Sequence, residues 1–364
     1  MSRMRAGAVL GEARRNLVSG TSRAGLLGAV FIVLVGLLAV LDVRAVVGVL
    51  DGAARFRAAG ATVAVLKSEG SVDGRRCDAL GGTGALTFAG AIRRGEPVQF
   101  YAMPAAQVGV VEVTPGLIEL LPVIAQPART NPLVAGGVWL SADLAATLGA
   151  GPGSVLLTAS GPVTVAGVYT WPDDGRARDL GYTVVAPVPA DGRFDQCWTE
   201  TWPTDAGLTG LSYIAAAGAG VGQPPTLGQL NTSLGTTYDA ARLLTNRLTA
   251  PAPWAAAVIG LALGYLAVRI RRVELASALH ARVPRAHVGW GQLLEAGAWA
   301  VGGAVVVCAG LLWAARLGNP DPGWVTWLIG VRTVVAGTAA VLVGVVVGVL
   351  TTREKHLFRY AKDR

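Results

Sequence analysis

Four long runs of apolar residues divide the chain, at 24–41, 250–268, 288–315 and 324–350. A helix rises about 1.5 Å per residue, so each run is long enough to cross the roughly 30 Å hydrocarbon core of a bilayer. The first run could instead be a signal peptide, but its polar leader is long and no small-x-small cleavage site follows closely. The pattern therefore favours four membrane helices, of which the first is an uncleaved anchor.

Between the first two runs the pattern changes to short segments rich in β-branched residues and separated by Gly and Pro. Such segments are typical of strands. The expected strands are 62–67, 97–102, 108–113, 154–159, 162–169 and 183–188. Helices are expected at 115–121 and 141–148, where Ser141 is suited to cap the helix start. This region is large enough to bury its own core, so it is predicted to be one α+β domain.

Two segments beside this domain have helical character. Residues 42–59 and 229–249 each place apolar side chains at intervals typical of a helix. We therefore expect two helical stalks that enter the bilayer side by side. The second would meet it at Pro251 and Pro253, where proline can kink or restart a helix.

Basic residues gather at the ends of the apolar runs. Segments 1–23 and 269–287 each hold five Lys or Arg against one acid, and 351–364 holds five against two. With four spans, these segments share one face of the membrane, and the positive-inside rule makes that face the cytoplasm. Region 44–250 has 14 basic and 16 acidic residues and would lie outside.

The predicted fold is a membrane protein with four transmembrane α-helices and an α+β extracytoplasmic domain inserted between helices 1 and 2 on helical stalks. Its predicted parts are a cytoplasmic N-terminal segment (1–23), the first span (24–41), the stalks and outer domain (42–249), the second span (250–268), a cytoplasmic loop and helix (269–287), the third span (288–315), a short outer loop (316–323), the fourth span (324–350) and a cytoplasmic tail (351–364). Lysine is rare beside arginine, as in GC-rich bacterial genomes, so we expect a bacterial plasma membrane with both termini in the cytoplasm.

The composition agrees with a membrane protein, because 52% of the 364 residues are hydrophobic and only 15% are charged. A net charge of +8 would ordinarily suggest nucleic acid as a partner. The excess lies in the segments beside the spans, however, and is explained by membrane topology. We therefore expect contacts with membrane lipid and none with nucleic acid.

Two of the three cysteines, Cys77 and Cys197, fall in the predicted outer region. An oxidising compartment favours a disulfide between them, although two free thiols are the alternative. The third, Cys308, lies in the third span, where it would pack as a small hydrophobic residue.

The sequence offers no catalytic, metal-binding or cofactor-binding site. Its histidines, at 280, 287 and 356, all flank the spans on the cytoplasmic side, which leaves the outer domain without imidazole for a catalytic triad or a usual zinc site. No lysine follows a glycine-rich phosphate loop. The acidic group Asp173, Asp174 and Asp179 could supply a calcium site, but Pro-Asp-Asp-Gly is first a turn sequence.

The stretch 269–295, RIRRVELASALHARVPRAHVGWGQLLE, joins the second and third spans and is basic and helix-forming. Arg269, Arg271 and Arg272 would meet anionic headgroups or an acidic protein surface. Glu274 lies in the first turn of the following helix, where a carboxylate favours the helix dipole. On its residues alone, the stretch is either a helix that contacts a partner or an ordinary basic loop.

This stretch resembles the transmission loop of the FtsX-like/MacB-like permease family. That loop reads Arg-Arg-x-Glu-Leu/Ile-Ala-x-Leu-Arg-Ala-Leu-Gly-Val-Pro-Arg, with a Glu a few residues into the next span. The matching residues are Arg271, Arg272, Glu274, Leu275, Ala276, Val283, Pro284, Arg285 and Glu295. The departures are Ala278, Leu279, His280 and Ala281 in the middle, and Arg282 where the family has glycine, the residue that tolerates positive φ.

The similarity extends across nearly the whole chain. EARRNLVSGTSRA, at 12–24, is similar to the amphipathic cytoplasmic helix before the family's first span. GGVWLSADLAATLGAGPGSVLLTASGPVTVAGVY, at 136–169, resembles the outer-domain pattern of a strand, a helix ending in Leu-Gly and two further strands. Four spans with the outer domain after the first are also the family arrangement.

The resemblance implies a permease subunit of an ABC transporter of the type VII, mechanotransmission class. The residues it implies in ATPase coupling are Arg271, Arg272, Glu274, Leu275, Ala276, Leu279, Val283, Pro284 and Arg285. ATP and Mg would bind only in two partner ATPase subunits, and a second permease, identical or different, would complete a dimer. The implied cargo is a lipoprotein, peptide, antibiotic or other hydrophobic molecule, and an outer substrate-binding, lipoprotein or hydrolase partner is possible.

Two other functions stay open. A regulator of the FtsX type would use the same motion to activate a cell-wall hydrolase and would transport nothing. A membrane-anchored receptor or enzyme without an ATPase is weakened by the absence of outer histidines and by the transmission loop.

Few charged residues lie within the predicted spans. Glu295 is expected to be reached from the cytoplasmic interface and to pair with an arginine of the loop. Arg332, near the outer end of its span, is expected to extend to lipid headgroups rather than bind substrate. These are too few for an obvious ion or solute path. The spacings Gly260-x-x-x-Gly264 and Gly344-x-x-x-Gly348 fit close helix contacts, although chance also explains them in a glycine-rich chain.

Overall fold

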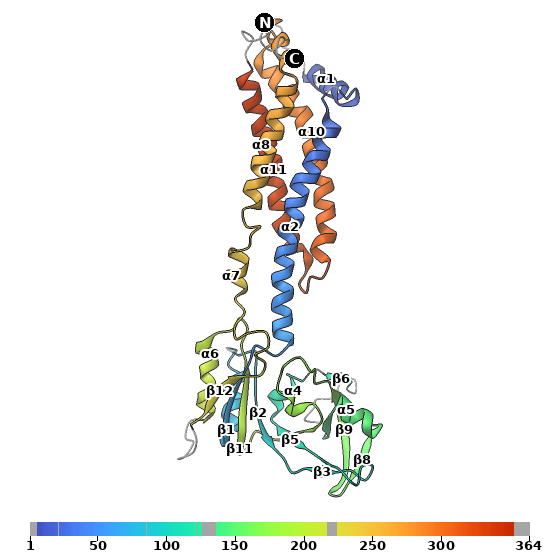
Figure 1. The fold of residues 1–364 in the computed structure, drawn as a ribbon, viewed down its shortest axis with the longest axis vertical. Coiled ribbons are helices and arrows are strands. Elements are labelled where there is room, and N and C mark those ends of the chain that lie inside the picture. The colour runs from blue at the N-terminus through green and yellow to red at the C-terminus, as the bar shows by residue number, and fades with distance from the viewer. Residues whose placement is uncertain are drawn as a thin grey trace. The chain divides into compact units, whose positions relative to one another are not determined.

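The computed structural model describes residues 6–20, 22–84, 86–121, 123–125, 136–216 and 224–352. The chain divides into two compact units, which Figure 1 draws as ribbons. The helical unit comprises Met1–Gly52 and Ala240–Arg364, and the α+β unit comprises Ala53–Asp239.

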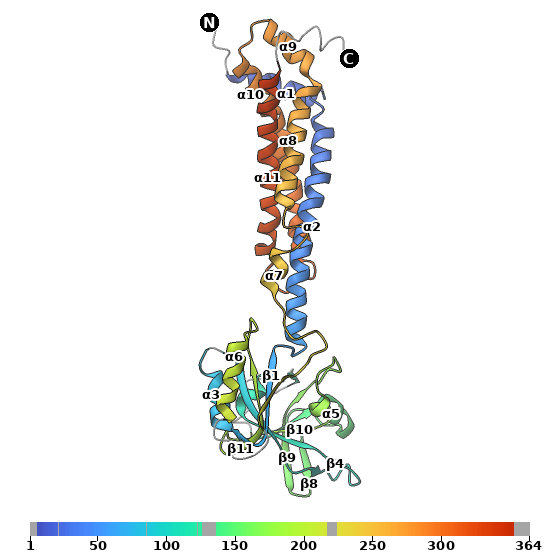
Figure 2. The ribbon, with the colours of Figure 1, turned by 60° about the vertical axis from the view of Figure 1, so that its left-hand side comes forward.

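Among the residues that the structure describes, the helical unit contains four helices that are long and apolar enough to cross a membrane, which confirms the number predicted from the apolar runs. These are α2 (Ala24–Ala58), α8 (Ala252–Ile270), α10 (Arg285–Arg316) and α11 (Gly323–Thr351). Three shorter helices are α1 (Ala6–Val18), α7 (Ala240–Thr245) and α9 (Arg272–His280). Figure 2 shows α1 and α9 at the same end of the four long helices.

The four long helices bury one apolar face and expose another. Phe31, Val35 and Leu311 are fully buried where the helices meet. In contrast, Val305 on α10 and Val335 on α11 are 64% and 58% exposed. A helix that is apolar all round needs an apolar environment on its outer side as well, so the unit belongs in a lipid bilayer.

Exposed tryptophans mark both ends of α10. Trp290 and Trp313 are 63% and 70% exposed, and their separation along the helix corresponds to about 35 Å. Tryptophan favours the two membrane–water interfaces. The part of α10 between them therefore matches the thickness of one bilayer.

Helices α8 and α11 pack backbone against backbone. A Cβ added at Gly260 would lie 2.1 Å from the carbonyl oxygen of Gly337, and one at Gly264 would lie 2.0 Å from that of Val341. From the other side, a Cβ at Gly344 would lie 2.2 Å from the oxygen of Leu261. The two glycine spacings noted in the sequence are thus close helix contacts.

The α+β unit is built on one long mixed sheet. In the described part of the unit, its ten strands run in the order β12-β1-β11-β2-β5-β10-β7-β9-β6, with β8 paired beside β9. The strand bounds are β1 (Val63–Asp73), β2 (Phe88–Arg94), β5 (Val110–Val113), β6 (Val123–Ala125), β7 (Val138–Ser141), β8 (Val155–Thr158), β9 (Gly161–Tyr169), β10 (Val184–Pro187), β11 (Arg193–Glu200) and β12 (Thr226–Gln229), and a separate pair consists of β3 (Val98–Gln99) and β4 (Gln107–Val108). The helices are α3 (Gly74–Gly81), α4 (Pro115–Ile118), α5 (Ala142–Leu148) and α6 (Ala206–Gly210), with 3-10 turns at Arg178–Leu180 and Leu211–Ala216.

A disulfide joins helix α3 to strand β11. Cys77 and Cys197 are bonded, which confirms the predicted pairing, and both side chains are fully buried. They lie in an apolar cluster with Leu66, Phe194 and Ala215. The bond therefore fixes α3 against the sheet inside a core that is already packed.

The predicted second stalk is wrong over most of its length. Of residues 229–249, only Ala240–Thr245 form a helix, α7. Asn231 donates instead to the carbonyl oxygens of Ala59, at 3.0 Å, and Asp174, at 3.1 Å, and Gly235 has a φ of +92°. These side-chain contacts and the left-handed glycine hold the segment out of a helix. The first stalk, in contrast, is continuous helix to Ala58.

Helix α5 begins where predicted, but Ser141 does not cap it. The hydroxyl of Ser141 accepts a hydrogen bond from the Thr183 N–H at 3.3 Å and makes no capping bond. The helix ends at Leu148, followed by Gly149 with a φ of +60°. Strands β7, β8 and β9 then complete the strand, helix and two-strand pattern noted in the sequence.

Candidate functional site

The turn between α8 and α9 is closed by a buried arginine. Arg271 lies between the two helices and is 8% exposed. Its Nε donates to Glu274 Oε2 at 2.8 Å, and a second guanidinium nitrogen donates to Glu274 Oε1. The fork of the guanidinium thus holds the first turn of α9 against the last turn of α8.

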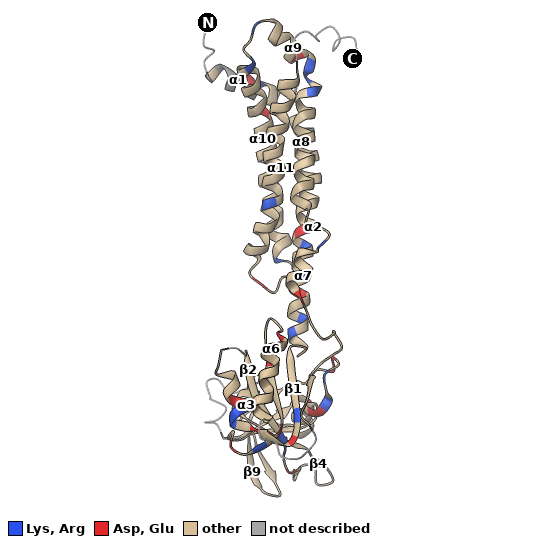
Figure 3. Ribbon diagram, turned by 90° about the vertical axis from the view of Figure 1, so that its left-hand side faces the viewer, with Lys and Arg blue, Asp and Glu red and all other residues tan. Residues whose placement is uncertain are grey.

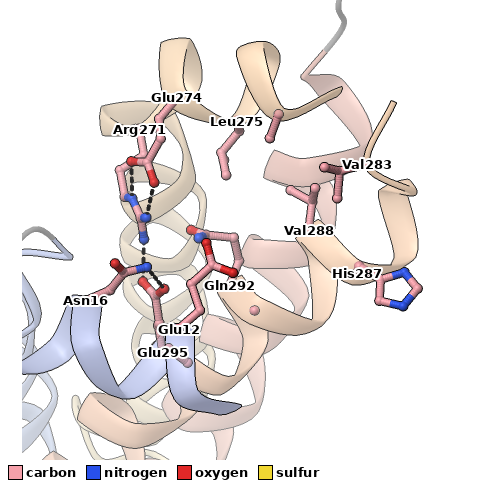
Figure 4. Close-up of a pocket in the computed structure, with 13 residues that line it drawn as sticks. Glu12, Asn16, Arg271, Glu274, Leu275, Val283, His287, Val288, Gln292 and Glu295 are labelled. Carbon is pink, nitrogen blue, oxygen red and sulfur yellow. Dashed lines mark hydrogen bonds and ion pairs between the residues drawn. The ribbon is translucent and has the colours of Figure 1, made fainter. Parts of the chain in front are cut away.

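The same arginine reaches a carboxylate on α10. Arg271 Nη1 forms an ion pair with Glu295 Oε2, and Glu295 is 5% exposed. The other oxygen of Glu295 accepts a hydrogen bond from Asn16 Nδ2 of α1 at 2.7 Å. Figure 4 shows these contacts as dashed lines. The expected pairing of Glu295 with a loop arginine is therefore confirmed.

We call Asn16, Arg271, Glu274 and Glu295 the junction network, because they join α1, the α8–α9 turn and α10. Burial opposes the charge of Arg271, but the two carboxylates outweigh it and raise the pKa of its guanidinium. Removing one partner from a buried ion pair typically costs about 3–5 kcal/mol, because the other charge stays buried. The network therefore links the three elements through buried contacts.

The remaining residues expected in coupling lie around this network. Leu275 and Ala276 are buried, at 5% and 0% exposure. Arg272, Leu279 and Val283 are half-buried, whereas Pro284 and Arg285 are exposed. Figure 3 shows basic residues in blue where α8 meets α9. The motif therefore has an inner apolar side that packs on the helices and an outer side that is basic.

The turn after α9 keeps a glycine-like geometry without glycine. Arg282 has a φ of +62°, in the left-handed region that non-glycine residues rarely adopt. The resemblance placed glycine at this position. The chain thus preserves the turn that the family's glycine allows, with a side chain that is strained there.

Two further residues at the network, Asn16 and Gln292, are not marked by any motif in the sequence. Asn16 is one polar residue among many on α1. Gln292 lies one helical turn before Glu295, and is 7% exposed. Its i, i+3 spacing from Glu295 places both on one face of α10, and this was the signal available in the sequence.

A second buried charge lies at the opposite end of the helical unit. Asp42 of α2 is fully buried and accepts from Arg247 Nε at 2.8 Å. Arg332 of α11 lies 4.0 Å from the other Asp42 oxygen, with its own side chain 58% exposed. Arg332 therefore contacts an acid of the protein as well as facing outward.

The acidic turn of the α+β unit is occupied by arginines. Asp174 accepts from Arg176 Nε at 2.9 Å and from Arg176 Nη2 at 2.7 Å. This hydrogen bonding, together with the charge of Arg176, lowers the pKa of Asp174. Asp173 likewise accepts from Arg178. Within the described ranges, no group of three His, Cys, Asp or Glu residues could hold a metal ion.

No family model and no curated protein matches the chain. Among solved structures, it is similar to the periplasmic region of MacB from Actinobacillus actinomycetemcomitans, with a TM-score of 0.37 and 10% identity over 48% of this chain and 91% of that one. It is similar to the extracellular domain of the ABC-type transporter YknZ from Gram-positive bacteria, with a TM-score of 0.32 and 14% identity over 43% and 90% of the two chains. A domain of a permease protein from Porphyromonas gingivalis has a TM-score of 0.32 and 14% identity, over 41% and 78%.

The chain is a multi-pass membrane protein with an α+β unit.

Proposed function

We propose that the chain is the permease subunit of an ABC transporter in which a partner ATPase pushes on α9. The α1 and α9 end of the helical unit would face the cytoplasm, with both chain termini, and the α+β unit would lie outside. ATP and Mg would bind only in the partner, as two ATPase subunits on a permease dimer.

The junction network is the observation that supports this proposal. A force on α9 reaches Arg271 through Glu274, and Arg271 is bonded to Glu295 of α10. The close glycine contacts between α8 and α11 extend the connection to a third helix. A motion of α9 would therefore shift α8, α10 and α11 together instead of bending the loop.

In this mechanism, the α+β unit acts on the substrate, and the membrane helices do not form a channel for it. A solute path through a membrane protein usually needs polar or ionisable residues along it. The buried charges described above lie near the ends of the apolar runs, at Asp42 after the first run and at Arg271 with Glu295 beside the second and third. Export or extraction of a hydrophobic molecule, peptide or lipoprotein outside the membrane fits this arrangement.

The test is co-purification of an ATPase with the intact chain. Ser277 is exposed on α9, away from buried Leu275 and Ala276. Ser277→Glu adds an acid to the exposed side of α9, and we expect it to lower retention of an ATP-hydrolysing subunit at least tenfold. Ser160→Glu makes the same change in an exposed turn of the α+β unit and is expected to retain the subunit.

Two results would contradict the proposal. One is a wild-type chain that retains no ATP-hydrolysing protein, and the other is equal retention by both variants. Orientation is tested separately with Ser277→Cys and Ser160→Cys in a Cys308→Ala chain. A thiol reagent that cannot cross the membrane is expected to label Cys at 160 in intact cells, and Cys at 277 only after permeabilisation.

A further inference from the structure

A pocket opens beside the junction network, between α1, α9 and the start of α10. It has a volume of about 150 Å³, enough for several water molecules or one side chain. Figure 4 shows the side chains that line it. Its apolar walls come from Ala13, Leu275, Ala278, Val283 and Val288.

The polar lining of the pocket is acidic. Glu12, Glu274 and Glu295 line it, against the single guanidinium of Arg271. Arg271 already bonds Glu274 and Glu295, whereas Glu12 is exposed on α1. The pocket thus carries a net negative charge on an end of the molecule that is otherwise rich in arginine.

One largely buried polar residue at the pocket has no hydrogen-bond partner among the described residues. Gln292 is 93% buried and lines the pocket, yet it makes no hydrogen bond with any residue that the structure describes. The Nδ1 atom of His287, which also lines the pocket, is buried and without a partner among the same residues. The Gln292 amide therefore has free donor and acceptor capacity that a group entering the pocket would use.

We propose that the pocket receives one lysine or arginine side chain from the partner ATPase. This inference rests on the proposed function and deepens it. Lysine and arginine carry only donors, and carboxylate and amide oxygens of the pocket are acceptors. The hydrocarbon stem of either side chain would lie along the apolar walls, as such stems do on apolar surfaces.

The charges around the pocket explain why this contact would fix the register of the partner. The exposed face of the turn carries Arg282 and Arg285, which an acidic partner surface would complement. A single basic side chain within that acidic surface would fit only at the acidic pocket. Complementarity of this kind selects one docking position among several of similar total charge.

The experiment uses the intact chain in lipid nanodiscs and the ATPase subunit that co-purifies with it, whose dissociation constant is measured by titration. Glu12→Gln and Gln292→Leu are each expected to weaken binding about tenfold. Gly11→Lys changes the charge of α1 by the same amount as Glu12→Gln. A Cβ at Gly11 meets no atom within 4 Å, and the variant is expected to bind as the wild type does.

A thermal melt separates binding from folding. Because Gln292 has no partner in the described chain, Gln292→Leu is expected to keep or raise the melting temperature while weakening ATPase binding. If all three variants bind the ATPase as the wild type does, the pocket does not receive a side chain of the partner, and the proposed function is unaffected. No ATPase binding by the wild-type chain would remove both. If Gln292→Leu binds poorly and also melts at a lower temperature, Gln292 acts through folding, and its proposed contact with the partner is refuted.

Discussion

Gly264, at the contact between α8 and α11, has the closest backbone approach of the described glycines in the helical unit. In Gly264→Ala, the new Cβ would lie 2.0 Å from the carbonyl oxygen of Val341 and 2.8 Å from its carbon, both backbone atoms of α11. Ordinary contact requires the two backbones to separate by about 1.4 Å. That movement would also loosen the neighbouring contact of Gly260 with Gly337.

The size of the effect follows from two opposing contributions. Overpacking of this kind costs about 1–3 kcal/mol, and a clash with backbone lies at the upper end because no rotamer relieves it. Alanine is a better helix former than glycine by about 1 kcal/mol. The net loss is about 2 kcal/mol, which lowers the melting temperature of a unit of this size by about 4–8 °C.

The assay is thermal unfolding of the chain in detergent, followed by tryptophan fluorescence. Gly302→Ala is the matched control, because the same substitution on α10 places a Cβ with no atom within 4 Å. It is expected to melt at the wild-type temperature or slightly above. If Gly264→Ala melts together with Gly302→Ala, the close packing of α8 on α11 is wrong.

Three further predictions concern single features of the chain. Cys77→Ser with Cys197→Ser should lower the free energy of unfolding of the α+β unit by about 3–5 kcal/mol, because the bond closes a loop of 120 residues. Denaturant unfolding measures this loss. A reducing agent that destabilises the double variant as much as the wild type would contradict the prediction. Arg282→Gly should raise the melting temperature, since a left-handed conformation costs a non-glycine residue about 1–2 kcal/mol and the extra freedom of unfolded glycine offsets only about half of that. Arg282→Ala keeps the strain and should show no rise. A lower melting temperature for the glycine variant would contradict the strain at Arg282. The lowered pKa of Asp174 stabilises the α+β unit above about pH 4, the usual carboxyl range, and this contribution is lost as acid protonates the carboxylate beside Arg176. The free energy of unfolding, measured from pH 7 to pH 3, should fall more steeply for the wild type than for Asp174→Asn. Parallel curves for the two proteins would refute the role of the pair.

Features encoded within one segment could be predicted from the sequence. The four membrane helices follow from apolar runs, and α5 with its end at Gly149 follows from local helix signals. The disulfide followed because only Cys77 and Cys197 fall outside the spans. The pairing of Glu295 with a loop arginine was also accessible, because a charge buried in a span needs a partner close by.

Features that depend on distant parts of the chain were missed. Strands β2 and β11 were not predicted, since both are paired on two sides in the middle of the sheet and lack a clear alternation. The segment before α7 looked helical, but contacts of Asn231 with Ala59 and Asp174 decide its conformation. Likewise, Gln292 became a candidate only when α1 and α9 were seen to enclose it.

The burial of Asp42 has a consequence for how the protein is made. Its partner Arg247 is 205 residues further along the chain, which at about 5–20 residues per second reaches the ribosome exit roughly 10–40 s later. During this interval α2 carries a buried acid without the counter-charge of Arg247. The ion pair therefore forms only after the whole intervening segment has been synthesised. A chain that stalls before Arg247 emerges would stay without the pair, and would be exposed to quality-control proteases for longer than a completed chain.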